Sequence, residues 1–319
     1  MSQSTDSRVC NSRPDHVCEM TACGGQAARD ALFARMEGFL RERLGAGLVL
    51  EQFATESSKV VYRARLADGR KLFVKLCSTA CGEQARKLAD ELNLPFVAKV
   101  VHLFPWADGL SVICQEWLEG EHVPPERMSA AQCTALASAY RRFCAALRPE
   151  HMTLAPLDTA GNYETVVAFA RRHPLARPFL RRLIALPPDA RDVRREDRVP
   201  GHGDFHYLQY LFKGDAVAAF LDFDGIMPVL PAQDLAYAVA RRYFKGRLSR
   251  ADLRQLDARF RQLMAELPYA PQDWRRAINV YRLLFAARRL KTHARFAGVA
   301  LIVARRDRAL QRMLSLVSG

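Results

Sequence analysis

The sequence predicts an α+β fold with two lobes, in which a small antiparallel β-sheet with one helix precedes a larger, mainly helical region. Segments with the residue alternation and the turn residues of β-strands lie mostly in about the first 120 residues. Beyond them, apolar residues recur at helical spacing over long stretches. The chain has 319 residues, 50% of them hydrophobic, so it is large enough to fold as two such lobes.

Residues 1–25 are rich in polar side chains and are predicted to form a flexible N-terminal segment. They contain no apolar stretch of the kind that directs secretion, so we expect a cytoplasmic protein with reduced thiols. The segment includes Cys10, His16, Cys18 and Cys23. Because their spacing matches no regular zinc pattern, the sequence does not favour a metal site there.

Residues 26–119 are predicted to form the β-rich lobe. A helix over 26–44 leads into it and ends at Gly45. Asp68-Gly69, between two strand-like runs, is a two-residue hairpin signal. A short helix is expected over 83–92. The predicted strands cover residues 48–54, 60–66, 71–76, 96–104 and 110–118.

Residues 120–319 are predicted to form the helical lobe. Helices are expected over 129–147 and 163–172 and across most of 232–317. Two short strands, 210–212 and 216–224, are expected to form a hairpin. Since no apolar run approaches the roughly 20 residues that a transmembrane helix needs, no membrane span is expected.

The residues that carry chemistry begin with the segment His-Gly-Asp-Phe-His-Tyr-Leu-Gln at 202–209. Phosphoryl transfer from ATP requires an acceptor hydroxyl held in line and metal ions that neutralise the phosphate charge. Asp204 on a tight loop can orient that hydroxyl and accept its proton. Five residues on, Gln209 offers an amide oxygen to a metal, and Asp222 offers a second carboxylate at the end of a hairpin strand. This spacing is typical of a phosphotransferase.

These motifs resemble those of the aminoglycoside phosphotransferase and choline kinase superfamily, the small-molecule relatives of the protein kinases. That family has His-Gly-Asp-x-His-x-x-Asn, then Ile/Leu-Asp-Phe/Trp-Glu/Asp and Asp-Leu-Ala. Here the corresponding segments read HGDFHYLQ, LDFD and Asp234-Leu235-Ala236. The resemblance covers about residues 45–240 and implies a protein-kinase-like two-lobe fold with ATP and Mg²⁺ as cofactors. One departure is Gln209, where the family usually has Asn.

The resemblance also implies roles for residues of the helical lobe. Asp204 would be the catalytic residue, and Gln209, Asp222 and Asp224 would be metal ligands. Asp234 is interpreted as a structural anchor that accepts hydrogen bonds from N–H groups of the catalytic loop. The two histidines of that loop are interpreted as buried residues that fix its shape.

In the β-rich lobe, the resemblance implies a nucleotide site. Lys75 would bind the ATP phosphates, with Glu83 as its partner on the following helix and Glu91 as the alternative partner. The remaining contacts would come from a loop over the phosphates and from the connection between the lobes, namely Ser57, Ser58, Glu116 and Trp117.

Together these features predict an ATP- and Mg²⁺-dependent phosphotransferase that phosphorylates a hydroxyl group of a small molecule. The net charge of +14 and the excess of Lys and Arg after residue 272 favour a neutral or anionic, sugar-type acceptor over a cation. The alternative is a catalytically silent kinase fold that binds nucleotide, because Gln209 replaces Asn. The sequence contains no nucleic-acid-binding motif and no Ala-Pro-Glu segment of a protein kinase.

Overall fold

The computed structural model describes residues 25–52, 61–188, 193, 197–223, 226–245 and 248–317. The chain divides into two compact units. Unit 1 comprises Met1–Glu119 and Leu221–Gly225, and unit 2 comprises Gly120–Phe220 and Ile226–Gly319. Three predicted site residues lie outside the described residues, namely Ser57, Ser58 and Asp224. The Cys and His residues of the N-terminal segment also lie outside them.

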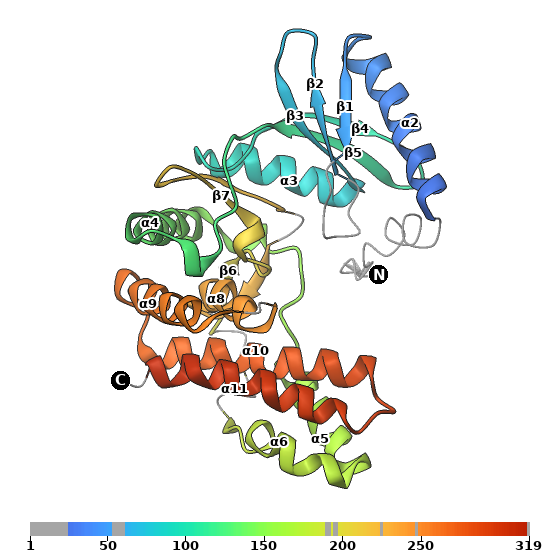
Figure 1. Ribbon diagram of the computed structural model, residues 1–319. Coiled ribbons are helices and arrows are strands. Elements are labelled where there is room, and N and C mark those ends of the chain that lie inside the picture. Colours follow the sequence, from blue (N-terminus) through green and yellow to red (C-terminus); the bar gives the residue numbers. More distant parts are fainter. Residues whose placement is uncertain are drawn as a thin grey trace, which may run out of the picture. The chain divides into compact units, whose positions relative to one another are not determined.

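Unit 1 is built on a five-stranded antiparallel sheet with the strand order β1-β2-β3-β5-β4 (Figure 1). The turn from β2 to β3 contains Gly69 with φ 84°, and the Gly69 N–H donates to the carbonyl oxygen of Leu66 at 3.0 Å. The hairpin predicted at Asp68-Gly69 is therefore confirmed. The strands are β1 (Val49–Gln52), β2 (Val61–Arg65), β3 (Lys71–Ser78), β4 (Val100–Pro105) and β5 (Leu110–Glu116).

Helix α2 (Gly25–Leu44) packs on this sheet. Its buried residues Leu32, Met36 and Leu40 recur every four positions and so lie on one helical face. They join the strands in one apolar core that includes Tyr62. The helix predicted over 26–44 is thus present, and the burial of this face holds it to the sheet.

Helix α3 (Thr79–Leu92) begins four residues before the predicted start at Glu83. The reason is local, because Ser78 at the end of β3 caps the helix. Its Oγ accepts a hydrogen bond from the N–H of Cys81 at 3.2 Å. A serine at this position satisfies one of the free N–H groups of the first helical turn.

Unit 2 is mainly helical, as predicted (Figure 1). The long predicted segment 232–317 is divided into separate helices, with Ser249, Pro271 and Val299 at the starts of new ones. The helices are α4 (Ala130–Ala146), α5 (Thr159–Arg172), α6 (Arg177–Ile184), α8 (Gln233–Lys245), α9 (Arg250–Glu266), α10 (Pro271–Thr292) and α11 (Val299–Val317). Short 3₁₀ turns are η1 (Pro125–Arg127), η2 (Pro149–His151), η3 (Pro174–Ala176) and η4 (Tyr207–Gln209).

Two small strand pairs complete unit 2. The predicted hairpin is formed by β7 (Tyr210–Lys213) and β8 (Ala216–Phe220). A second antiparallel pair joins β6 (Val199–Gly201) to β9 (Met227–Val229). This pair brings the chain before the catalytic loop beside the chain that leads into α8.

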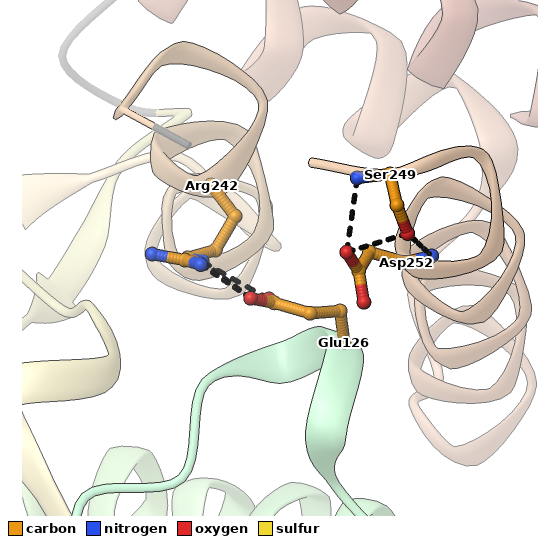
Figure 2. Close-up of polar contacts among 4 residues, drawn as sticks. All are labelled: Glu126, Arg242, Ser249 and Asp252. Carbon is orange, nitrogen blue, oxygen red and sulfur yellow. Dashed lines mark hydrogen bonds and ion pairs between the residues drawn. The ribbon is translucent and has the colours of Figure 1, made fainter. Parts of the chain in front are cut away.

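Figure 2 shows how α8 is tied to the first turn of unit 2. Arg242 on α8 forms a bidentate ion pair with the largely buried Glu126 of η1, with Nε 3.0 Å from both carboxylate oxygens. At the start of α9, the Ser249 Oγ accepts from the N–H of Asp252 at 3.1 Å, and the Asp252 carboxylate accepts from the N–H of Ser249 at 2.9 Å. Such reciprocal caps fix where a helix begins.

Among the described residues, no helix combines the length and the apolar character needed to cross a membrane.

Candidate active site

The predicted catalytic loop, residues 202–209 of unit 2, is anchored by Asp234 at the start of α8. Its fully buried carboxylate accepts hydrogen bonds from the N–H of His202 at 2.7 Å and the N–H of Gly203 at 2.8 Å. It also accepts from the Tyr140 hydroxyl at 3.1 Å. Burial raises the pKa of Asp234 above its ordinary value, while His202 and the hydrogen bonds oppose that increase. The predicted role of Asp234 as an anchor for loop N–H groups is confirmed.

Gly203 makes this anchoring possible. Its φ of 79° lies in the left-handed region that favours glycine. A Cβ atom at this position would lie 2.1 Å from the sulfur of Met227 on β9. The glycine before Asp204 is therefore required both by the backbone conformation and by the close approach of the β6–β9 pair.

Asp204 follows Gly203 and presents its carboxylate to solvent. Its side chain is 59% exposed. By contrast, His202, Phe205 and His206 on the same loop are buried. The loop thus rests on buried neighbours and leaves the Asp204 carboxylate accessible.

His206 connects Asp204 to Gln209. Its Nδ1 accepts a hydrogen bond from the N–H of Leu208 at 3.2 Å, while Nε2 faces the other two side chains. That Nε2 lies 3.7 Å from the Asp204 carboxylate and 3.4 Å from the side-chain amide of Gln209. The buried imidazole fixes the shape of the loop, as predicted, and holds the Gln209 amide near Asp204.

An aromatic platform that the sequence motifs do not predict lies beside Asp204. The Tyr237 ring lies 6.0 Å from the His206 ring, edge to face, and stacks on Tyr281 at 4.7 Å. Burial raises the pKa of Tyr237 to about 12, and the nearby Asp204 charge adds to the increase. The sequence does contain one indication of this position. Tyr237 follows Asp234 by three residues, so both side chains lie on the same side of α8.

In unit 1, Lys75 and Asp222 form an ion pair with 2.8 Å between Nζ and Oδ1. Their side chains are 9% and 16% exposed. Asp222 has φ 65°, a left-handed conformation that Asp tolerates better than most residues. The structure therefore brings the predicted phosphate-binding lysine together with the predicted metal-binding aspartate.

The other predicted nucleotide residues of unit 1 are placed as follows. Glu83 is exposed on α3, and Glu91 lies 3.9 Å from Lys87 within the same helix. Glu116 ends β5, and its N–H donates to the Lys99 carbonyl at 2.9 Å. The Glu116 N–H is therefore already hydrogen-bonded within unit 1. Their roles toward a nucleotide stay predictions.

Trp117 follows β5 and is half-buried. The guanidinium of Arg63 on β2 lies 5.5 Å from the centre of its ring. This cation–π contact within unit 1 favours a packing role for the indole, and its predicted contribution to nucleotide binding stays a prediction.

Two of the predicted metal ligands carry oxygen donors of the chemical kind that a magnesium ion accepts. Such an ion takes one or two carboxylates from the protein and completes its octahedral shell with phosphate and water oxygens. Asp222 of unit 1 carries a carboxylate and Gln209 of unit 2 carries an amide oxygen, and their roles as metal ligands stay predictions. No group of three His, Cys, Asp or Glu side chains suited to a metal occurs among the described residues.

Comparison with known proteins gives the family. The model of the phosphotransferase enzyme family matches residues 49–277, which is more than half of the chain. The chain therefore belongs to this family, and the predicted resemblance is confirmed. No curated protein sequence matches the chain.

Solved structures with the same fold span most of the chain. Amicoumacin kinase hAmiN, in complex with AMP-PNP, Ca²⁺ and Ami, has a TM-score of 0.56 at 11% identity and covers 90% of this chain and 96% of its own. A thermostable mutant of aminoglycoside phosphotransferase APH(4)-Ia, with ADP and hygromycin B, has a TM-score of 0.54 at 15% identity, covering 86% and 97%. APH(3'')-Id from Streptomyces rimosus, with ADP and streptomycin, has 0.51 at 20% identity, covering 79% and 98%. The predicted two-lobe kinase-like fold is confirmed.

Proposed function

We propose that the protein transfers the γ-phosphoryl group of ATP, with Mg²⁺, to a hydroxyl of a neutral or anionic sugar-type molecule. The observation that carries this proposal is the exposed Asp204 carboxylate, on a loop whose His202 and Gly203 N–H groups are hydrogen-bonded to the buried Asp234. The structures of kinases similar in fold, with ADP or AMP-PNP bound, support the choice of nucleotide.

Each residue has a defined task in this proposal. Asp204 orients the acceptor hydroxyl and accepts its proton as the oxygen attacks phosphorus. Lys75 binds phosphate oxygens, and Asp222 and Gln209 are the metal ligands, with Asp224 as a further predicted ligand. When bound, Mg²⁺ neutralises the charge that develops on the phosphates.

The charges near Asp204 support an anionic acceptor over a cationic one. Arg241 lies one helical turn after Tyr237 on α8. Arg288 lies one turn after Phe285 on α10, and the Phe285 ring is 6.0 Å from that of Tyr237. Both arginines act electrostatically on Tyr237. In the part of the chain that the structure describes, neither lies within ion-pair distance of a carboxylate.

The test is Mg²⁺-dependent release of ADP from ATP with a panel of sugars, sugar phosphates, amino alcohols and aminoglycosides. Stimulation by a sugar or sugar phosphate, lost in Asp204→Asn, is the expected result. Arg241→Gln and Arg288→Gln should raise KM for a sugar phosphate and leave KM for the neutral sugar nearly unchanged. Arg250→Gln on the exposed start of α9 is the matched control.

Two other results would contradict the proposal. Faster turnover of aminoglycosides than of sugars would exclude a neutral or anionic sugar-type molecule as the preferred acceptor. ATP binding without turnover of any acceptor would favour the alternative of a silent kinase fold, in which Gln209 does not support catalysis. In that case Gln209→Asn, which restores the residue usual in the family, should recover activity.

A further inference from the structure

Two loops of unit 2 are joined at one end of the helical bundle. The Nε2–H of His173, at the end of α5, donates to the carbonyl oxygen of Ala294, in the turn between α10 and α11, at 3.0 Å. Each of these two residues is followed, two positions later, by a large apolar side chain that is mostly exposed to solvent. Leu175 is 87% exposed and Phe296 is 64% exposed.

These side chains project from a rigid base. Ala176 and Leu180 of the α5–α6 region share one buried apolar cluster with Val299 and Val303 of α11. Helix α5 packs on α10, and α6 packs on α11 (Figure 1). Leu175 and Phe296 are thus exposed in segments that connect helices packed against one another.

The surroundings of these side chains are strongly basic. We call residues 171–182 and 291–298 the tip surface. It contains no Asp or Glu, and the sequence has none anywhere in 165–188 or 274–306. Its exposed cations are Arg171, Arg172, Arg177, Arg181, Arg182, Lys291 and Arg295.

We propose that the tip surface docks on an anionic membrane surface. Leu175 and Phe296 insert among the lipid headgroups, and the surrounding arginines interact with lipid phosphates. A combination of exposed apolar side chains and clustered Lys and Arg is what binding to an anionic bilayer interface requires. This role is separate from phosphoryl transfer, because it uses none of the residues of the candidate active site.

Two features favour a membrane over nucleic acid as the partner. Nucleic acid would pair with the arginines but would gain little from Leu175, the most exposed of the large apolar side chains among the described residues. Phe179 on α6 is also exposed and adds apolar surface within the same segment. Of these two partners, the anionic membrane is the one that gains from both the charge and the apolar groups.

The experiment is co-sedimentation of the full-length protein with vesicles of phosphatidylcholine, alone or mixed with phosphatidylglycerol. Arg171→Gln/Arg177→Gln/Arg295→Gln removes three charges from the tip surface. Since each charge near such a surface contributes about fivefold in affinity, binding should fall about 100-fold. The matched control removes three exposed charges from α9, namely Arg250→Gln/Arg254→Gln/Arg261→Gln.

A second pair of variants tests insertion. Leu175→Ser/Phe296→Ser should weaken binding at least about tenfold, whereas Val101→Ser/Leu154→Ser, also at exposed positions, should not. Because the substituted side chains are exposed, melting temperatures should be unchanged. Should a variant fail to fold, Phe296→Trp with brominated lipid provides an independent test, and quenching of the new tryptophan is expected.

Binding to mixed vesicles that is lost in both tip variants and kept in both controls would support the proposal. Absence of binding to mixed vesicles would overturn it. An equal loss of vesicle binding in the α9 control would also overturn it, because the net charge of the protein, and not the tip surface, would then explain the binding. Binding to RNA with no binding to vesicles, or vesicle binding unaffected by Leu175→Ser/Phe296→Ser, would also refute it.

Discussion

Replacing Lys75 by methionine should destabilise the protein far more than the same change at Lys71, although both lysines lie on β3 and both form short ion pairs. The Lys71 Nζ is 2.6 Å from Glu119, but these side chains are 40% and 59% exposed. The Lys75 Nζ is 2.8 Å from Asp222, and this pair is largely buried. Solvent screens the first pair much more than the second.

The magnitude follows from distance and burial. At 2.8 Å with an effective dielectric constant of about 20, the gross attraction between Lys75 and Asp222 is about 6 kcal/mol. Desolvation of both groups offsets part of it. Removing one partner of a buried pair typically costs about 3–5 kcal/mol, because the other charge remains buried. Since Asp222 keeps some exposure, we expect about 3 kcal/mol for Lys75→Met.

The assay is urea unfolding followed by circular dichroism, arranged as a double-mutant cycle with Asp222→Asn. Asparagine tolerates the positive φ of Asp222, so the second mutation leaves the backbone unstrained. The double variant should be less destabilised than the sum of the single variants, by about 2 kcal/mol. Additive single effects, or equal destabilisation by Lys75→Met and Lys71→Met, would refute the reasoning.

Three further predictions concern the catalytic loop and its surroundings. Gly203→Ala should lower the free energy of unfolding, measured by thermal melting, by about 1–3 kcal/mol and should reduce kcat. The reason is that φ is 79° and the new methyl group meets Met227. An unchanged kcat would contradict this prediction. Asp234→Asn should lower kcat with the ATP dissociation constant unchanged, since it frees loop N–H groups; a change in ATP affinity alone would argue against it. The folded-state pKa of Tyr237 is raised from 10.0 to about 12, so the neutral tyrosine contributes about 3 kcal/mol to the free energy of unfolding. This contribution should be present in full below pH 10 and lost as pH rises through 12. Tyr237→Phe should remove that part of the alkaline loss measured by urea unfolding, and an unchanged pH profile would disprove it.

Some parts of the fold were beyond sequence reasoning for identifiable reasons. The β6–β9 pair was missed because its strands have three residues each and contain Pro200 and Pro228, which read as loop signals. The start of α3 was placed too late because the capping serine also ends a strand. The tip surface depends on a hydrogen bond between His173 and Ala294, 121 positions apart.

The sequence by itself determined the two-lobe fold class and the family of the protein. Hydrophobic periodicity and contiguous motifs such as HGDFHYLQ are local properties, so they can be recognised without coordinates. Only the tertiary structure decided that Lys75 pairs with Asp222, 147 positions away, and that Tyr237 lies beside Asp204. These contacts depend on how strands and helices pack, and a linear sequence does not show which distant side chains that packing brings together.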